Sequence, residues 1–354
     1  MMSEEYVHLQ RYQREQTYDW NVEHAPQQLP DVPVPRVTGQ WTYCGLPVNS
    51  PLGIAAGPLL NGSWCRYYAA LGFDVLTYKT VRSGARECYA LPNLLPVATE
   101  PMTGQEDSVP ATQNWQGSWA VSFGMPSKAP SVWMADIRST KANLQAGQLL
   151  SLSVVGTMQS DWSLTELAQD YAACTCRAFD AGADCVEMNF SCPNVCSADG
   201  QLFQNPVNAA FVAQTVREAV GPEKPLLVKI GYISDNRILA NLIVGLSEFV
   251  NAIVTTNSIP AKVTDANGNT LFNGQQRGIC GKAILNSSVE QVRRIRTVID
   301  EGNLPLEVIG VGGIETAQHV KLYLDAGASS VQLATAVMID PLVGVKIRKE
   351  FQHQ

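Results

Sequence analysis

Short apolar runs alternate with amphipathic stretches along the chain from residue 52 onward. Eight runs are rich in Val, Ile and Leu and lack apolar–polar alternation, which is typical of strands buried on both faces. They cover residues 52–57, 75–81, 149–156, 185–191, 226–232, 252–258, 306–313 and 330–337. Helical periodicity lies between several of them, over residues 164–182, 205–221, 238–249, 288–302 and 315–327.

This alternation predicts parallel strand–helix–strand units. Eight such units close into a (β/α)8 TIM barrel, which is an α/β fold. A doubly wound open sheet is the alternative, but no GxGxxG motif follows the first strand. We assign the barrel domain to residues 41–354, beginning with a short hairpin at 41–50, and residues 1–40 to an N-terminal arm.

Three connections are too long for ordinary loops between a strand and a helix. They cover residues 82–128, 192–204 and 259–280. Because each follows a strand, we expect all three as long loops on the C-terminal face, where barrels carry their chemistry. Trp115 and Trp119 in the first connection either shape a pocket mouth or pack that loop onto the barrel.

Polar residues and glycines gather at the carboxyl ends of the predicted strands, where barrel enzymes place catalytic groups. Lys79 and Lys229 interrupt apolar strands, and a charge is costly to bury unpaired. They either meet an anion or an electron-rich cofactor, or extend outward from the strand ends. Gly312–Gly313 and the turn 277–284 precede helices, so their amides suit a phosphorylated cofactor unless both are only tight turns. The other candidates at strand ends are Asn189, Cys192, Asn194, Asn257, Ser258 and Thr335.

A thiol is the best candidate for proton transfer. The four histidines lie away from the strand ends, and no carboxylate cluster there has metal-binding spacing. We therefore expect neither a histidine base nor a metal site. Cys192 can accept a proton once neighbouring groups lower its pKa. A packed core thiol, or a pair with Cys196, remains the alternative.

Charge and hydropathy restrict the partners of the chain. The 354 residues carry a net charge of −7, without a basic stripe to neutralise nucleic-acid phosphates. The N-terminal segment lacks the apolar centre of a signal peptide, and no apolar run reaches the ~18–20 residues that span a bilayer. We expect a cytoplasmic protein that acts on a small molecule, without nucleic acid or membrane.

Eight stretches occur in the order in which one enzyme family carries its motifs. They are SPLGIAAG, TYKTV, MNFSCPNV, LLVKIG, VTTNSI, GICGKAI, VIGVGGIET and VQLATA, within residues 41–342. Through them the chain resembles the dihydroorotate dehydrogenases, FMN-containing TIM barrels that oxidise dihydroorotate to orotate in pyrimidine biosynthesis. Cysteine in NFSCPN and a polar arm are similar to the soluble class 1 enzymes, whereas class 2 enzymes use serine and an apolar N-terminal segment.

The resemblance implies a role for each matching residue. Lys229 would bond the flavin near N1, and Lys79 would lie against both the flavin and the substrate. Cys192 would take the proton from C5 of dihydroorotate while hydride leaves C6 for flavin N5. The implied cofactor-binding residues are Ala55, Ala56, Gly57, Lys79, Lys229, Gly281, Gly312, Gly313, Ala334 and Thr335. The implied substrate-binding residues are Lys79, Gly124, Asn189, Asn194, Asn257 and Ser258.

One stretch departs from the family pattern. Where the family has NSxGxxN, whose first Asn and glycine backbone help to bind the orotate carboxylate, this chain has VSFGMPS at 121–127. Gly124 is kept, but Val121 cannot donate a side-chain hydrogen bond and Ser127 replaces the last Asn. Two alternatives to dihydroorotate oxidation follow: the same flavin chemistry on a dihydropyrimidine or other heterocycle without the carboxylate, or a non-catalytic FMN-binding subunit.

The resemblance also implies partners. Electrons from the flavin would pass to a soluble acceptor such as fumarate, or to a partner subunit that carries FAD and an iron–sulfur cluster. The class favours a homodimer.

Overall fold

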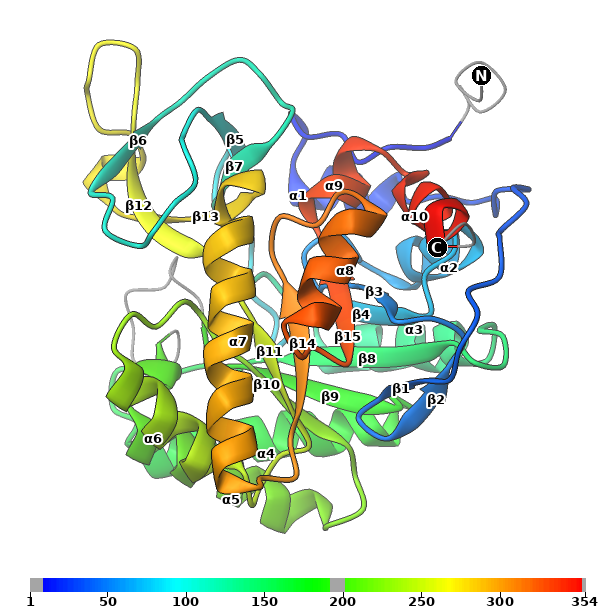
Figure 1. Ribbon diagram of the computed structural model, residues 1–354, viewed down its shortest axis with the longest axis vertical. Helices are drawn as coiled ribbons and strands as arrows, with labels where there is room; N and C mark the ends of the chain where they lie inside the picture. Colours follow the sequence, from blue (N-terminus) through cyan, green and yellow to red (C-terminus); the bar gives the residue numbers. More distant parts are fainter. Residues whose placement is uncertain (1–8, 192–200, 352–354) are drawn as a thin grey trace.

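The computed structural model describes residues 9–191 and 201–351. Within these residues eight parallel strands close into a barrel, which confirms the predicted TIM-barrel class (Figure 1). Each strand lies inside one of the eight apolar runs. In order around the barrel they are β3 (Leu52–Ile54), β4 (Val75–Val81), β8 (Leu149–Val154), β9 (Cys185–Asn189), β10 (Leu226–Lys229), β11 (Ala252–Thr255), β14 (Glu307–Val311) and β15 (Ser330–Leu333), which pairs again with β3.

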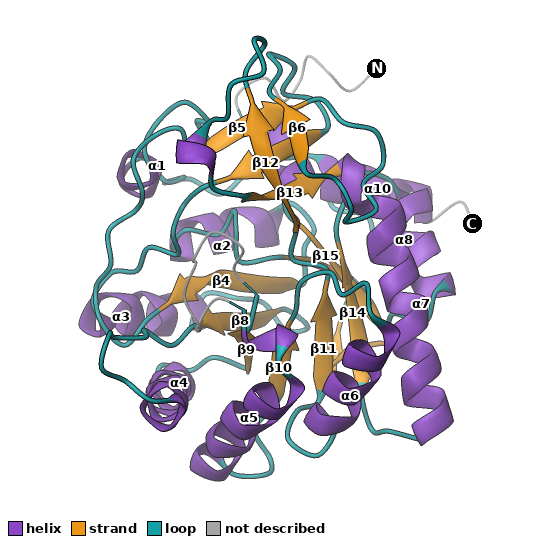
Figure 2. Cartoon of the chain, turned by 90° about the vertical axis from the view of Figure 1, so that its left-hand side faces the viewer, coloured by secondary structure: helices purple, strands orange, loops and turns teal. Residues whose placement is uncertain are grey.

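Helices alternate with these strands and cover the outside of the barrel (Figures 1 and 2). All five predicted helical segments are confirmed. A capping box formed by Ser163 and Glu166 starts one of them, because it satisfies amides that the first turn leaves open. The helices are α2 (Gly62–Ala70), α3 (Pro130–Lys141), α4 (Leu164–Asp180), α5 (Pro206–Val220), α6 (Asn236–Leu246), α7 (Leu285–Gly302), α8 (Ala317–Asp325), α9 (Thr335–Ile339) and α10 (Val343–Phe351). Short 3-10 turns cover Leu202–Gln204, Phe272–Gly274 and Lys282–Ile284.

The predicted hairpin at 41–50 closes the N-terminal end of the barrel. It consists of β1 (Trp41–Tyr43) and β2 (Leu46–Val48), which pair antiparallel. Tyr43 is fully buried and belongs to the apolar cluster that fills the barrel interior. The Glu307 carboxylate accepts hydrogen bonds from the backbone amides of Cys44 (3.0 Å) and Gly45 (2.9 Å), which fixes the hairpin against β14.

A second sheet lies beyond the barrel, at the top of Figure 2. Among the described residues its strands run in the order β5 (Leu94–Val97), β7 (Ser118–Val121), β13 (Arg277–Gly281), β12 (Ile259–Thr264) and β6 (Ser108–Pro110). The connections 82–128 and 259–280 were expected to be loops, and that expectation is wrong: they pair with one another. The physical reason is an apolar face, since Ile259, Ala261 and Val263 alternate with more exposed residues and pack on Ala120 and Ile279. Of the third connection, residues 192–200 lie outside the described part.

The N-terminal arm packs against α2 and reaches the second sheet. Between residues 9 and 40 it forms one helix, α1 (Tyr18–Glu23), which begins after Thr17, whose side chain accepts a hydrogen bond from the Trp20 amide. Further along, the Trp64 indole donates to the backbone oxygen of Asn21 (3.1 Å). The Arg14 guanidinium lies 4.7 Å from the ring centre of Trp115. We keep residue 40 as the proposed boundary between the arm and the barrel domain.

No helix within residues 9–191 and 201–351 is both long enough and apolar enough to cross a membrane.

Candidate active site

Two adjoining pockets open at the carboxyl ends of the barrel strands, the face on which the sequence analysis placed its candidate residues. The first, which we call the central pocket, receives Lys79 from β4, Asn189 from β9 and Lys229 from β10. The second, the glycine pocket, is lined mainly by residues at the carboxyl ends of β13, β14 and β15 and just beyond them. Asn257, Cys280, Ala334 and Thr335 line both pockets, so one elongated ligand could occupy the two. The structure thus brings twelve predicted residues together: Ala56, Gly57, Lys79, Gly124, Asn189, Lys229, Asn257, Gly281, Gly312, Gly313, Ala334 and Thr335.

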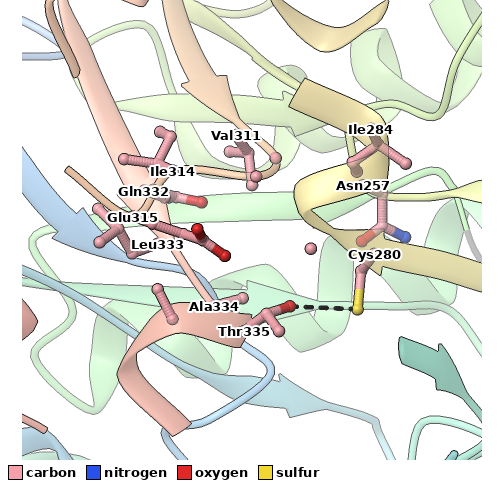
Figure 3. A pocket seen from close by; sticks show the side chains of 14 residues that line it. Asn257, Cys280, Ile284, Val311, Ile314, Glu315, Gln332, Leu333, Ala334 and Thr335 are labelled. Atoms are coloured by element: carbon pink, nitrogen blue, oxygen red, sulfur yellow. Dashed lines mark hydrogen bonds between the residues drawn. The ribbon is translucent and has the colours of Figure 1, made fainter. Parts of the chain in front are cut away.

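The glycine pocket also contains Gly312 and Gly313, as the sequence predicted, and Figure 3 shows it from close by. Gly313 has φ +70°, and a Cβ added there would lie 2.7 Å from the Cβ of Leu285, so only glycine fits. The backbone amides of Gly313, Ala334 and Thr335 have no acceptor among the described residues. Converging amides of this kind form an anion-binding nest.

Ala55 and Ser258 are buried next to this site, but their side chains are not part of either lining. The Ala55 amide donates to the backbone oxygen of Leu333 (2.9 Å) and so joins the end of β3 to that of β15. Cys192 and Asn194 lie outside the described residues, and their roles stay predictions.

The central pocket has a polar side formed by buried cations and carboxamides. Lys79 is 8% exposed, and its Nζ lies 4.7 Å from the ring centre of Phe123. Asn189 is also 8% exposed, and its Nδ2 lies 3.7 Å from the sulfur of Met125. Asn257 donates from Nδ2 to the backbone oxygen of Ser191, which fixes its carboxamide at the pocket edge.

The stretch 121–127 supplies a turn of backbone amides to the same pocket. Gly124 has φ +73° and Met125 has φ +53°, so consecutive residues adopt the left-handed conformation. The amides of Phe123, Gly124 and Met125 meet no acceptor within the described part of the chain. Left-handed turns with successive open amides are suited to bind an anion.

Val121 and Ser127, the two departures from the family pattern, differ in their position. Val121 lines the central pocket at the end of β7. Ser127 does not line it: its hydroxyl donates to the backbone oxygen of Lys128 (2.8 Å) and accepts from the Arg82 amide (3.0 Å). Only the valine can therefore act directly on a bound ligand.

Several residues of the site were not predicted from the sequence. Glu187 is fully buried in β9, and its Oε1 lies 3.8 Å from Nζ of Lys229. A glutamate inside the apolar run CVEMN was the available signal, because a buried charge needs a partner. The apolar wall was missed as well. Besides Trp119, which the sequence had singled out, this wall contains Leu94, Phe123, Met125 and Met338.

Trp119 fulfils both interpretations that the sequence left open. It lines the central pocket, and its ring makes an edge-on contact with Trp115 at 5.6 Å, which packs the connection together. Its backbone oxygen accepts a hydrogen bond from the thiol of Cys280 (3.4 Å). Thr335 donates in turn to that sulfur (3.3 Å, Figure 3), and burial raises the pKa of the Cys280 thiol. This thiol is therefore a neutral wall group rather than a base.

Comparisons with known proteins agree in pointing to one family. A family model described as dihydroorotate dehydrogenase matches residues 40–354. The dihydroorotate dehydrogenase of Dictyostelium discoideum is 32% identical over 321 residues, covering 86% of each chain. A dihydroorotate dehydrogenase (quinone) of Pseudarthrobacter chlorophenolicus is 28% identical over 324 residues, covering 88% of this chain and 84% of that one.

A solved structure supports the fold. The crystal structure of DHODH from Eimeria tenella in complex with ferulenol aligns with a TM-score of 0.70. It covers 89% of this chain and 83% of that one at 16% sequence identity, so it bears on the fold alone.

Proposed function

The chain belongs to the dihydroorotate dehydrogenase family, as its motifs predicted, and on that premise we propose that it is an FMN-dependent enzyme that oxidises dihydroorotate to orotate. Members of the family are oxidoreductases that act on CH–CH donors. FMN, when bound, supplies N5 as the acceptor of the hydride that leaves C6 of the substrate. The chain itself supplies the binding groups, the charges and the base.

The glycine pocket fits the FMN phosphate. Its open amides at Gly313, Ala334 and Thr335 offer donors to a dianion, and Gly281 and Gly312 line the same pocket. The central pocket adjoins it and would take the flavin ring. Ala55, Ala56 and Gly57 would back the ring, while Lys79 and Lys229 would contact it and favour negative charge on it.

A single observation carries the choice of substrate: the central pocket combines a cation, an open amide turn and two carboxamides. Lys79 and the amides of residues 123–125 would bind the carboxylate of dihydroorotate. Asn189 and Asn257 would bond the amide edges of its ring, together with Asn194 and Ser258. Backbone amides thereby offset the donor that Val121 cannot supply.

Proton removal falls to Cys192 in this proposal. Its thiolate would take the proton from C5 while the hydride leaves C6. A thiol with a free pKa of about 8.5 becomes an efficient base near neutral pH once neighbouring charges lower that value.

The proposal is tested by reducing the FMN-loaded protein anaerobically with dihydroorotate or with dihydrouracil, which lacks the carboxylate. We expect dihydroorotate to bleach the flavin absorbance at least about ten-fold faster, because the lost charge-assisted hydrogen bonds are worth roughly 1.5–3 kcal/mol. The measurement is stopped-flow absorbance at equal substrate concentrations. A protein that retains FMN but is not bleached by dihydroorotate would contradict the proposal.

Val121 favours a second candidate, a dihydropyrimidine or related heterocycle without a carboxylate. An apolar side chain in the pocket lining, next to Phe123 and Met125, suits an uncharged substituent better than an anion. Faster bleaching by dihydrouracil would support this candidate. The variant Val121→Asn should then shift the preference back toward dihydroorotate.

Glu315 should weaken the binding of FMN as long as its carboxylate is charged. The side chain is half-buried in the glycine pocket, pointing inward in Figure 3, and burial raises its pKa, with His319 and Lys282 opposing. We expect Glu315→Gln to bind FMN about three- to ten-fold more tightly, which corresponds to about 0.6–1.4 kcal/mol. Because protonation removes the charge, the advantage should be largest above the raised pKa and should vanish as the pH falls through it.

Fluorescence quenching of FMN by the apoprotein, measured across this pH range, gives the two affinities. Glu290→Gln is the matched control, since Glu290 is an exposed carboxylate on α7 that pairs with Arg293. An affinity ratio for Glu315→Gln that does not change with pH would rule out the carboxylate as the cause.

The remaining parts of the proposal follow the class resemblance. They are a small soluble acceptor such as fumarate or a partner subunit with FAD and an iron–sulfur cluster, a homodimeric assembly, a cytoplasmic location and a role in pyrimidine biosynthesis.

A further inference from the structure

Glu187 is a fully buried carboxylate in the middle of β9. Its neighbours in the strand, Val186 and Met188, face the apolar core, whereas Glu187 lines the central pocket with Asn189 and Lys229. An unpaired carboxylate at such a place would be strongly destabilising. Glu187 nevertheless occupies this buried position, so the groups around its carboxylate indicate what offsets the charge and what role the side chain has.

The two oxygens of Glu187 have different surroundings. Oε2 accepts a hydrogen bond from Nε2 of Gln332 (3.3 Å), and that amide also donates to Tyr43 (2.9 Å) and Thr77 (3.0 Å). Gln332 therefore anchors this oxygen in the barrel interior. Oε1 has no hydrogen-bond partner among the described residues and lies 3.8 Å from Nζ of Lys229 on the adjacent strand β10.

The distance of 3.8 Å between Oε1 of Glu187 and Nζ of Lys229 preserves most of their electrostatic attraction but is too long for a hydrogen bond, so the lysine N–H groups stay available to a ligand. A charge-assisted hydrogen bond between nitrogen and oxygen needs roughly 2.7–2.9 Å. Coulomb energy falls only as the inverse of distance, so at 3.8 Å about three quarters of the attraction at such a distance persists. Lys229 can thus be held by Glu187 while its N–H groups point to a ligand in the pocket.

We propose that Glu187 is a positioning residue that holds the Lys229 ammonium in the central pocket and offsets its charge, and thereby sets the reduction potential of the bound flavin. This inference rests on the proposed function, in which Lys229 bonds the flavin. Reduction adds negative charge to the ring, so a lone lysine would favour the reduced state. A carboxylate beside that lysine opposes this effect, which lowers the potential and lets the reduced cofactor pass its electrons on.

The variant Glu187→Gln removes the charge and keeps the shape and hydrogen-bonding capacity of the side chain. We expect the reduction potential of bound FMN to be higher than in the wild type by at least about 30 mV. For a two-electron reduction this corresponds to an equilibrium constant at least about ten-fold larger. The measurement is an anaerobic spectroscopic titration of the holoprotein against reference dyes. Glu187→Asp, which retains the charge, should bring the constant back to within about two-fold of the wild-type value.

Asp74→Asn is the matched control. Asp74 is a second buried carboxylate, paired with Arg348 just before β4 begins, at the opposite end of the barrel from the central pocket. Removing it takes away one buried charge without approaching the flavin. We expect lower thermal stability of this variant, and a reduction equilibrium constant within about two-fold of the wild-type value.

A second comparison, made in the variant Lys229→Gln, keeps the proposal testable if Glu187→Gln alone fails to fold. In Lys229→Gln the ion pair with Glu187 is absent, and adding Glu187→Gln removes its carboxylate charge as well, so both members of the pair become neutral, which cores generally tolerate. The equilibrium constant for two-electron reduction of FMN should again be about ten-fold larger in the double variant than in Lys229→Gln alone, which corresponds to a potential about 30 mV higher. An unchanged or lower potential in both comparisons, with FMN bound, overturns the role of Glu187. A wild-type protein that takes up no FMN contradicts the proposed function itself, and this inference with it.

Discussion

Replacing Cys192 by alanine is expected to slow the reduction of bound FMN by dihydroorotate by roughly 10²- to 10⁴-fold, the usual contribution of a positioned general base. The proton at C5 then has no acceptor, so the hydride cannot leave C6 without building up charge. The affinity for FMN and for orotate should change little, because neither depends on proton transfer. Stopped-flow absorbance gives the reduction rate, and spectral titration with orotate gives the affinity.

The pH dependence identifies the base. The wild-type rate should rise with pH as the thiol ionises and then level off. In Cys192→Ser the rate should continue to rise to higher pH, because a hydroxyl ionises far less readily than a thiol. Cys196→Ala is the matched control and should retain the wild-type rate, whereas an equal loss in both variants would favour a paired thiol. If Cys192→Ala kept the full rate, the base would have to be another group, and Glu187 in the central pocket would be the first to examine.

The barrel was predictable because its signal is local. A strand buried on both faces must be apolar throughout, and each of the eight runs shows this over a few residues. The positions of Lys79, Asn189 and Lys229 follow from the same reasoning, since parallel strands bring their carboxyl ends to one face.

The second sheet was not predicted, because its pairing depends on contacts between distant segments. β7 pairs with β5 on one side and with β13 on the other, about 160 residues further along the chain. Each strand is short, and Pro96 and Pro110 lie within β5 and β6, where a proline is unfavourable because it cannot donate to the ladder. Only β12 showed readable alternation.

The ion pair between Glu187 and Lys229 shows a similar limit. The sequence drew attention to the lysine but not to the glutamate, although both interrupt apolar strands. The adjacency of β9 and β10 was part of the prediction, and with it the pairing could have been found. The hydrogen bonds of Gln332 to that carboxylate and to Tyr43 of the hairpin could not be predicted, because they join segments that are far apart in the sequence.

Replacing Gly281 by alanine should have the second large effect, on both stability and cofactor binding. Gly281 ends β13 with φ +90°, and a Cβ there would lie 2.2 Å from the backbone oxygen of Gly117. Because the obstacle is backbone, β13 must move away from β7. We expect a loss of about 2–5 kcal/mol in the free energy of unfolding, from left-handed strain and overpacking together. Since Cys280 and Gly281 line the pockets, FMN affinity should fall by roughly ten- to hundred-fold, or about 1.4–2.8 kcal/mol.

Gly268→Ala separates the strain from the clash. Gly268 lies in the connection between β12 and β13 with φ +83°, but a Cβ there would meet nothing within 4 Å. This variant should lose only the cost of the left-handed conformation, about 1–2 kcal/mol, and should bind FMN like the wild type. Denaturant unfolding and FMN fluorescence titration measure the two quantities. Equal losses of FMN affinity in the two variants would show that the close approach of β13 to Gly117 does not shape the cofactor site.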